Sequence, residues 1–171
     1  MIRHLTPSEY KTMPWANGKG VTVEMLRVDD GGLKWRLSRA SVVENGDFSL
    51  FAGIERNLTV ITGPGFDLVG DGLHLHALPL QPVAFAGDVP IRAEGVTAAS
   101  DDFNVMTARA LPLPEVWVIH GAENLAEGGT LAIFALDAAR VGGIDLGRYD
   151  LVLTDNAITC AGPAIAVRLY G

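Results

Sequence analysis

Three segments of this chain place polar side chains where the sequence otherwise has the character of buried β-strand. They cover residues 15–24, 35–40 and 46–56. A polar group at an interior position costs free energy unless a partner satisfies it. Several such groups on neighbouring strands therefore predict a lined pocket rather than a plain apolar core.

The alternation of a strand around residue 38 identifies which side chains share a face. Arg36 and Ser38 fall on the same face because side chains two residues apart point the same way. A guanidinium has five fixed donors and, with a serine hydroxyl, suits the capture of a carboxylate. We therefore predict that Arg36 and Ser38 contact a ligand. The alternative is a structural ion pair between Arg36 and Glu24 or Glu55.

The third segment adds an aromatic ring, a hydroxyl and a second guanidinium. Phe48 is predicted to form a wall of the pocket, with ordinary core packing as the alternative. Ser49 is predicted to donate a hydrogen bond to the ligand. Arg56 begins a strand, and it either reaches the same anion or faces solvent.

Three further candidates come from other parts of the chain. Asn104 lies in an apolar strand, where its amide needs partners at both ends, either from the ligand or from backbone across a seam. Trp15 is predicted as a second wall of the pocket. Asn17 belongs to an Asn-Gly turn first and to the ligand site second.

The histidines and the single cysteine are assigned to roles outside this pocket. His74 and His76 alternate on a strand, as in the start of a metal-ligand set, but no glutamate follows at a short distance. We expect them to face solvent without a metal. His120 is expected to be partly buried, and Cys160 to be a small core residue.

Composition restricts the class of protein. The chain has 171 residues, of which 49% are hydrophobic, and a net charge of −7, which favours a folded globule and argues against a nucleic-acid partner. Its apolar runs are too short to span a bilayer, and we find no signal peptide. One cysteine excludes an internal disulfide and a thiolate zinc cluster. These features predict a cytoplasmic protein without a metal or other cofactor, and they leave open whether it is a monomer or a dimer.

Turn signals between short β-type runs predict an all-β sandwich or barrel. One short helix is expected near Ser8, after the proline at residue 7, and is expected to end near Met13. The pattern of residues 58–88 returns weakly in residues 115–154, which indicates two related halves. The segment Leu111-Pro-Leu-Pro114 forms a stiff join between them.

Taken together with a fourth segment at 102–106, the three opening segments resemble the HutD/Ves family of small bicupin proteins associated with bacterial histidine utilisation. The resemblance covers about the first two-thirds of the chain and is carried by Trp15, Asn17, Gly18, Gly20, Thr22, Glu24, Trp35, Arg36, Ser38, Ala40, Gly46, Phe48, Ser49, Phe51, Gly53, Arg56, Gly63, Phe85, Gly87, Asp88, Asn104 and Met106. One departure is Lys19, where the family usually has glycine.

The resemblance implies two fused cupin/RmlC-like jelly-roll barrels. We place the barrel with the ligand pocket at residues 1–105 and the other at 106–171, and leave strand exchange between them open. It also implies a regulatory protein that limits histidine utilisation by binding a small carboxylated intermediate, such as N-formylglutamate or urocanate.

Two alternatives to this function remain open. The first is a cupin enzyme, an isomerase or hydrolase acting on a small carboxylic acid, which needs a general base. The candidate bases are His74, His76, His120, Glu24 and Glu55. The second is a regulator that acts through a protein-binding surface, with the pocket vestigial.

Overall fold

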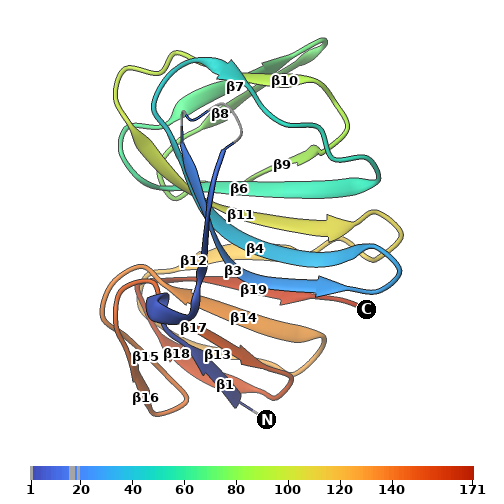
Figure 1. The fold of residues 1–171 in the computed structure, drawn as a ribbon. Coiled ribbons are helices and arrows are strands. Elements are labelled where there is room, and N and C mark those ends of the chain that lie inside the picture. Colours follow the sequence, from blue (N-terminus) through green and yellow to red (C-terminus); the bar gives the residue numbers. More distant parts are fainter. Residues whose placement is uncertain (1, 16–17, 19) are drawn as a thin grey trace. The chain divides into compact units, whose positions relative to one another are not determined.

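The structure, a computed structural model, describes residues 2–15, 18 and 20–171, and it is built almost entirely of antiparallel strands (Figure 1). This confirms the all-β prediction. None of the described segments forms a helix long and apolar enough to cross a membrane. The chain divides into two compact units, one of Lys11–Ala110 and one that joins the residues up to Tyr10 to Leu111–Gly171. We call them the pocket unit and the C-terminal unit.

The strands of the pocket unit form a six-stranded sheet in the order β2-β3-β4-β11-β6-β9 and a four-stranded sheet in the order β5-β10-β7-β8. Their bounds are β2 Lys11–Pro14, β3 Val21–Asp29, β4 Leu33–Val42, β5 Gly46–Asp47, β6 Ile54–Thr62, β7 Phe66–Gly70, β8 Leu73–Ala77, β9 Val83–Ala86, β10 Ile91–Glu94 and β11 Ser100–Ala108.

Apolar side chains from both sheets of the pocket unit form one core. The larger sheet contributes Val42, Leu58, Val60 and Phe85, and the smaller contributes Phe66, Leu68, Ala77, Ile91 and Ala93. Burial of one face of each sheet explains why polar and apolar residues alternate along these strands.

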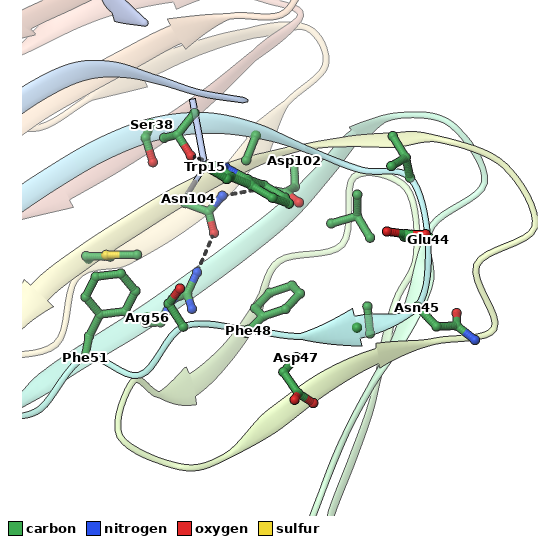
Figure 2. Close-up of a pocket in the computed structure, with 18 of the residues that line it drawn as sticks. Trp15, Ser38, Glu44, Asn45, Asp47, Phe48, Phe51, Arg56, Asp102 and Asn104 are labelled. Carbon is green, nitrogen blue, oxygen red and sulfur yellow. Dashed lines mark hydrogen bonds between the residues drawn. The ribbon is translucent and has the colours of Figure 1, made fainter. Parts of the chain in front are cut away.

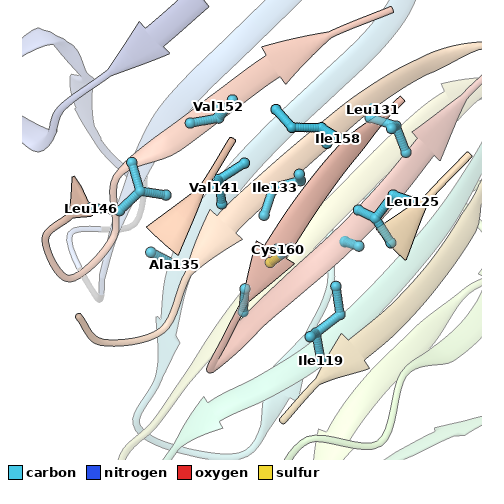
Figure 3. Close-up of a cluster of buried hydrophobic side chains, with 12 residues drawn as sticks. Ile119, Leu125, Leu131, Ile133, Ala135, Val141, Leu146, Val152, Ile158 and Cys160 are labelled. Atoms are coloured by element: carbon cyan, nitrogen blue, oxygen red, sulfur yellow. The ribbon is translucent and has the colours of Figure 1, made fainter. Parts of the chain in front are cut away.

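The C-terminal unit also has two sheets, with strand orders β1-β17-β14-β19-β12 and β13-β18-β15-β16. The bounds are β1 Ile2–Leu5, β12 Glu115–Ile119, β13 Ala122–Leu125, β14 Thr130–Ala135, β15 Ala139–Val141, β16 Ile144–Leu146, β17 Leu151–Thr154, β18 Ile158–Ala161 and β19 Ala164–Leu169. Figure 3 shows its apolar core, which includes the buried Cys160 together with Ile133 and Ile119, as expected for a small core residue.

The division of the chain differs from the boundary set from sequence, 1–105 and 106–171. The first strand, β1, pairs with β17, which places the first residues in the C-terminal unit. A cut at residue 105 also falls inside β11, whose eight paired residues up to Ala108 are hydrogen-bonded to β6.

The short helix predicted near Ser8, with proline as its first residue and an end near Met13, is not found. The only helical segment among the described residues is a 3-10 turn, η1, at Pro7–Glu9. The start signals do act locally, because the backbone N–H of Thr6 donates to the Glu9 carboxylate at 2.7 Å. The chain then leaves the helical path at Lys11, where β2 begins to pair with β3.

Candidate functional site

The pocket unit contains a cavity of about 520 Å³, a size suited to a small-molecule ligand. Its lining comes from β4, β6, β11 and the segment around β5, and includes Trp15, Thr22, Arg36, Ser38, Ala40, Phe48, Ser49, Phe51, Arg56, Asp102, Asn104 and Met106. Seven of the eight residues singled out from sequence are in this set. Asn17, the eighth, lies outside the described residues.

Strand register arranges the polar lining in rows across the six-stranded sheet. Ser38 of β4 is the register partner of Asn104 of β11, and Ala40 is the partner of Asp102. The side chains at 36, 38 and 40 share one face, as the alternation predicted, and the register places those at 102, 104 and 106 on the same face. Two adjacent strands, β4 and β11, thus present polar groups to one cavity.

Arg56 is the buried cation of the cavity. It is 8% exposed, and its guanidinium carbon lies 5.4 Å from the Phe48 ring, 5.3 Å from Phe51 and 5.1 Å from Phe85. Its Nη2 donates to Oδ1 of Asn104 at 3.3 Å, whereas its Nε has no partner among the described residues. Figure 2 shows the guanidinium between Phe48 and Phe51, directed toward Asn104. Arg56 therefore has a free donor and little water to satisfy it.

Asp102 continues this chain of hydrogen bonds. The amide nitrogen of Asn104 donates to the Asp102 carboxylate, so Arg56, Asn104 and Asp102 form one buried network (Figure 2). Burial raises the pKa of Asp102 to about 7, an effect opposed by the hydrogen bond from Asn104 and by the charge of Arg56. Burial likewise lowers the pKa of Arg56 to about 10, which leaves the guanidinium charged at neutral pH.

Arg36 is placed differently from the role predicted for it. It lines the cavity, but its Nε donates to Oε2 of Glu24 at 2.8 Å, and the two side chains are 11% and 13% exposed. This is the structural ion pair that the sequence left as an alternative. Because the Glu24 carboxylate already satisfies part of the guanidinium, Arg36 is a weaker candidate than Arg56 for holding an anion.

The aromatic side chains that line the cavity are also held by contacts with neighbouring residues. Phe48 is half-buried against Phe66 and Phe85, at ring-centroid distances of 6.3 and 6.5 Å, so both of its predicted roles are present. Trp15 is fixed by its indole N–H, which donates to the Thr22 hydroxyl at 2.9 Å. A Cβ at Gly20 would lie 2.8 Å from the Trp15 ring, so this position requires glycine.

None of the candidate general bases chosen from sequence lies among the described lining residues of the cavity. Glu24 is paired with Arg36, and Glu55 accepts from Nε of Arg109 at 2.6 Å. His74 and His76 are exposed, as predicted. His120 is also exposed, which corrects the expectation that it is partly buried: it follows the last residue of β12.

Sequence reasoning missed Asp102 as a site residue. The signal was available, because Asp102, Asn104 and Met106 alternate along one strand and must share a face. An aspartate at that position, flanked by a further aspartate, has the appearance of a turn residue instead.

A family model described as HutD matches residues 7–167 of this chain. The chain belongs to the HutD family.

Two of the relatives that match by sequence illustrate this assignment. An uncharacterised 21.2 kDa protein in the hutC 3′ region of Pseudomonas putida is 40% identical over 139 residues, which cover 78% of this chain and 73% of that protein. Protein Ves of Cronobacter sakazakii is 38% identical over 107 residues, 59% of each chain. The predicted HutD/Ves resemblance is confirmed.

Solved structures agree with this assignment. HutD from Pseudomonas fluorescens SBW25, described in a formate condition, superposes with a TM-score of 0.91 at 33% identity and covers 99% of this chain and 98% of its own. A cupin 2 conserved barrel domain protein from Leptotrichia buccalis has a TM-score of 0.58 at 8% identity, over 90% of this chain and 89% of its own. The second likeness concerns the fold alone, and it shows that the fold of this chain is cupin-like.

Proposed function

We propose that this HutD-family protein binds a small carboxylate in the cavity of the pocket unit and that Arg56 is its principal anchor. One observation carries the proposal: a buried guanidinium, enclosed by three phenyl rings, has a donor nitrogen without a partner among the described residues. A carboxylate at that point gains charge-assisted hydrogen bonds in an environment with little competing water.

The other lining residues have complementary roles in this proposal. Ser38 and Asn104, register partners on β4 and β11, contribute hydroxyl and amide groups beside the anion. Phe48 and Trp15 form the walls, and the exposed Ser49 reaches the ligand from the mouth. Arg36, held by Glu24, adds positive charge at the side of the cavity, and Asn17, which lies outside the described residues, is retained as a proposed contact.

We further propose that the ligand is an intermediate of histidine degradation, with N-formylglutamate and urocanate as the first compounds to test. The support is the association with hut genes in the descriptions of the relatives from P. putida and P. fluorescens. Both compounds combine a carboxylate with a second polar group. In this proposal, the second group forms a hydrogen bond with Asn104 or Ser49 of the cavity lining. We also propose that the protein is cytoplasmic and consists of two cupin-like barrels. It would limit the pathway by sensing this ligand.

Isothermal titration calorimetry with these two compounds tests the proposal. Arg56→Lys keeps the charge but loses the planar fork of donors. A hydrogen bond to a charged group contributes about 1.5–3 kcal/mol, so we expect affinity to fall about tenfold to a hundredfold. Arg39→Ala is the matched control, because Arg39 is on the opposite face of β4 from Ser38.

Far-UV circular dichroism and thermal unfolding accompany each titration, so that loss of fold is separated from loss of binding. Equal affinities in wild type, Arg56→Lys and Arg39→Ala would show that Arg56 is structural. Absence of heat with either compound, at concentrations up to the millimolar range, would reject these ligands.

Asp102 favours a second candidate function, that of an enzyme acting on a small carboxylic acid. A buried carboxyl with a pKa of about 7 in a cavity wall suits general acid–base chemistry near neutral pH. Incubation of wild type and Asp102→Asn with the same two compounds, followed by mass spectrometry, distinguishes the two functions. Product formation lost in Asp102→Asn supports an enzyme, and unchanged ligand supports a binding protein.

A further inference from the structure

We propose that the β7–β8 hairpin carries a binding site for a divalent transition metal, formed by Asp67, His74 and His76. The three residues contribute one carboxylate and two imidazoles, and their ligand atoms all lie within 4.8 Å of one another. They belong to the outer face of the four-stranded sheet and do not line the cavity, so this site is independent of the proposed carboxylate binding.

Strand register brings the three side chains together. His76 of β8 is the register partner of Asp67 of β7, and His74 is the partner of Val69, two residues further along. Because side chains alternate, His74, His76 and Asp67 all project from the face opposite Leu68 and Leu75. The buried residues of β7, in contrast, belong to the core of the unit.

The geometry is close to that of a metal site. Nε2 of His74 lies 2.9 Å from Oδ2 of Asp67, and Nδ1 of His76 lies 2.8 Å from Oδ1 of the same carboxylate. Zinc–nitrogen distances of about 2.0–2.1 Å place tetrahedral ligands roughly 3.3 Å apart. Small rotations of exposed side chains therefore suffice to direct all three ligands at one ion.

Charge around the site favours a cation. Asp67 contributes a carboxylate that is hydrogen-bonded to both histidines. On the other side of β7, Glu94 of β10 is the register partner of Asp67 and lies 3.0 Å from the Arg92 Nε. Asp47 lies 3.9 Å from Arg92, so two carboxylates share that one guanidinium.

The ligand types identify the class of metal. Imidazole with carboxylate suits zinc, nickel and copper, and three protein ligands leave at least one coordination position for water. From sequence, a third metal ligand was expected after the histidine pair, and no glutamate follows there. The third ligand instead comes from the preceding strand, where only hairpin register connects it to them.

The test uses tag-free protein and the metals alone. Calorimetric titration with Zn²⁺ and with Ni²⁺ is expected to give one ion per chain. His74→Ala, His76→Ala and Asp67→Asn should each weaken binding by at least about tenfold, since even outer partners of a metal contribute that much. His120→Ala is the control, because it removes an exposed histidine from the other unit.

A visible absorption spectrum with Co²⁺ provides a second measurement that reports the ligands directly. We expect d–d bands in wild type and His120→Ala, and their loss in the His74→Ala/His76→Ala variant. His74 and His76 are exposed, so we expect the double variant to retain the fold. Zinc affinity unchanged in the double variant, or binding weaker than about millimolar in wild type, would overturn the proposal.

Discussion

Arg36 and Arg56 lie in one row of the six-stranded sheet, on either side of Met106. Met106 of β11 is the register partner of Arg36 on β4 and of Arg56 on β6. The two guanidiniums nevertheless have different surroundings. Arg36 is paired with Glu24, whereas Arg56 is enclosed by phenyl rings and retains an unpartnered Nε among the described residues. The two arginines therefore differ in role. Arg36 takes part in an ion pair, whereas Arg56 keeps a donor that is available to an anion.

Replacing Arg36 should affect stability more than ligand affinity. Arg36→Ala leaves the largely buried Glu24 carboxylate without its partner, which costs about 1–3 kcal/mol of the free energy of unfolding. Urea denaturation followed by circular dichroism measures this change. The paired variant Glu24→Gln/Arg36→Met removes both charges and should recover part of the loss.

Calorimetry on Arg36→Ala completes this test. We expect its affinity for N-formylglutamate or urocanate to fall less than that of Arg56→Lys. A larger loss in the folded Arg36→Ala variant would return Arg36 to the role of principal anchor.

Asp102 should give the protein a recognisable pH dependence of stability. Its carboxyl binds a proton more tightly when folded, because burial raises its pKa from 3.8 to about 7. The resulting stabilisation is fully present below about pH 4 and is lost as the pH rises through 7. Between about pH 4 and 7, we therefore expect the free energy of unfolding of Asp102→Asn to fall less steeply than that of the wild type. The two slopes should differ by up to about 1.4 kcal/mol per pH unit.

Urea denaturation of both proteins across this range measures the difference. Asparagine keeps an oxygen that can accept from Asn104, so the comparison isolates the titrating proton. Parallel curves for wild type and Asp102→Asn would mean that Asp102 does not titrate in this range.

Two glycines in turns of the pocket unit should respond differently to alanine. Gly65 and Gly72 have φ values of +86° and +71°, so alanine costs about 1–2 kcal/mol at either position. A Cβ at Gly65 would also lie 2.1 Å from the Ala77 carbonyl oxygen, whereas Gly72 has open space. Overpacking adds about 1–3 kcal/mol for Gly65→Ala alone. Thermal unfolding should rank Gly65→Ala well below Gly72→Ala, and equal midpoints would contradict this account.

Local periodicity was sufficient to identify much of the candidate site. Alternation along one strand placed Arg36 and Ser38 on a common face, and the cavity includes both. Partners on other strands could not be obtained in this way. The pairing of Arg36 with Glu24 depends on the register of β3 against β4, which is shifted between Glu24 and Leu26 by an irregularity. Similarly, Asp67 is seven residues before His74, and only the hairpin brings them together.

The N-terminal helix shows why local signals can fail. The proline and glutamate after Thr6 do begin a turn, and hydrogen bonds of the expected kind are present. Four residues from Lys11 then pair with β3, and these long-range bonds determine the conformation. Sequence patterns give the preferences of a segment, whereas pairing with a distant strand decides between them.

The pairing of β1 with β17 has a consequence for the order of synthesis. β1 is made before every other described strand, whereas its partner strand at Leu151–Thr154 follows about 150 residues later. The pocket unit is continuous in sequence and can complete both of its sheets as soon as Ala110 has emerged. The C-terminal unit cannot complete its five-stranded sheet until the opposite ends of the chain meet. A nascent chain can therefore hold a completed cavity while β1 is still unpaired.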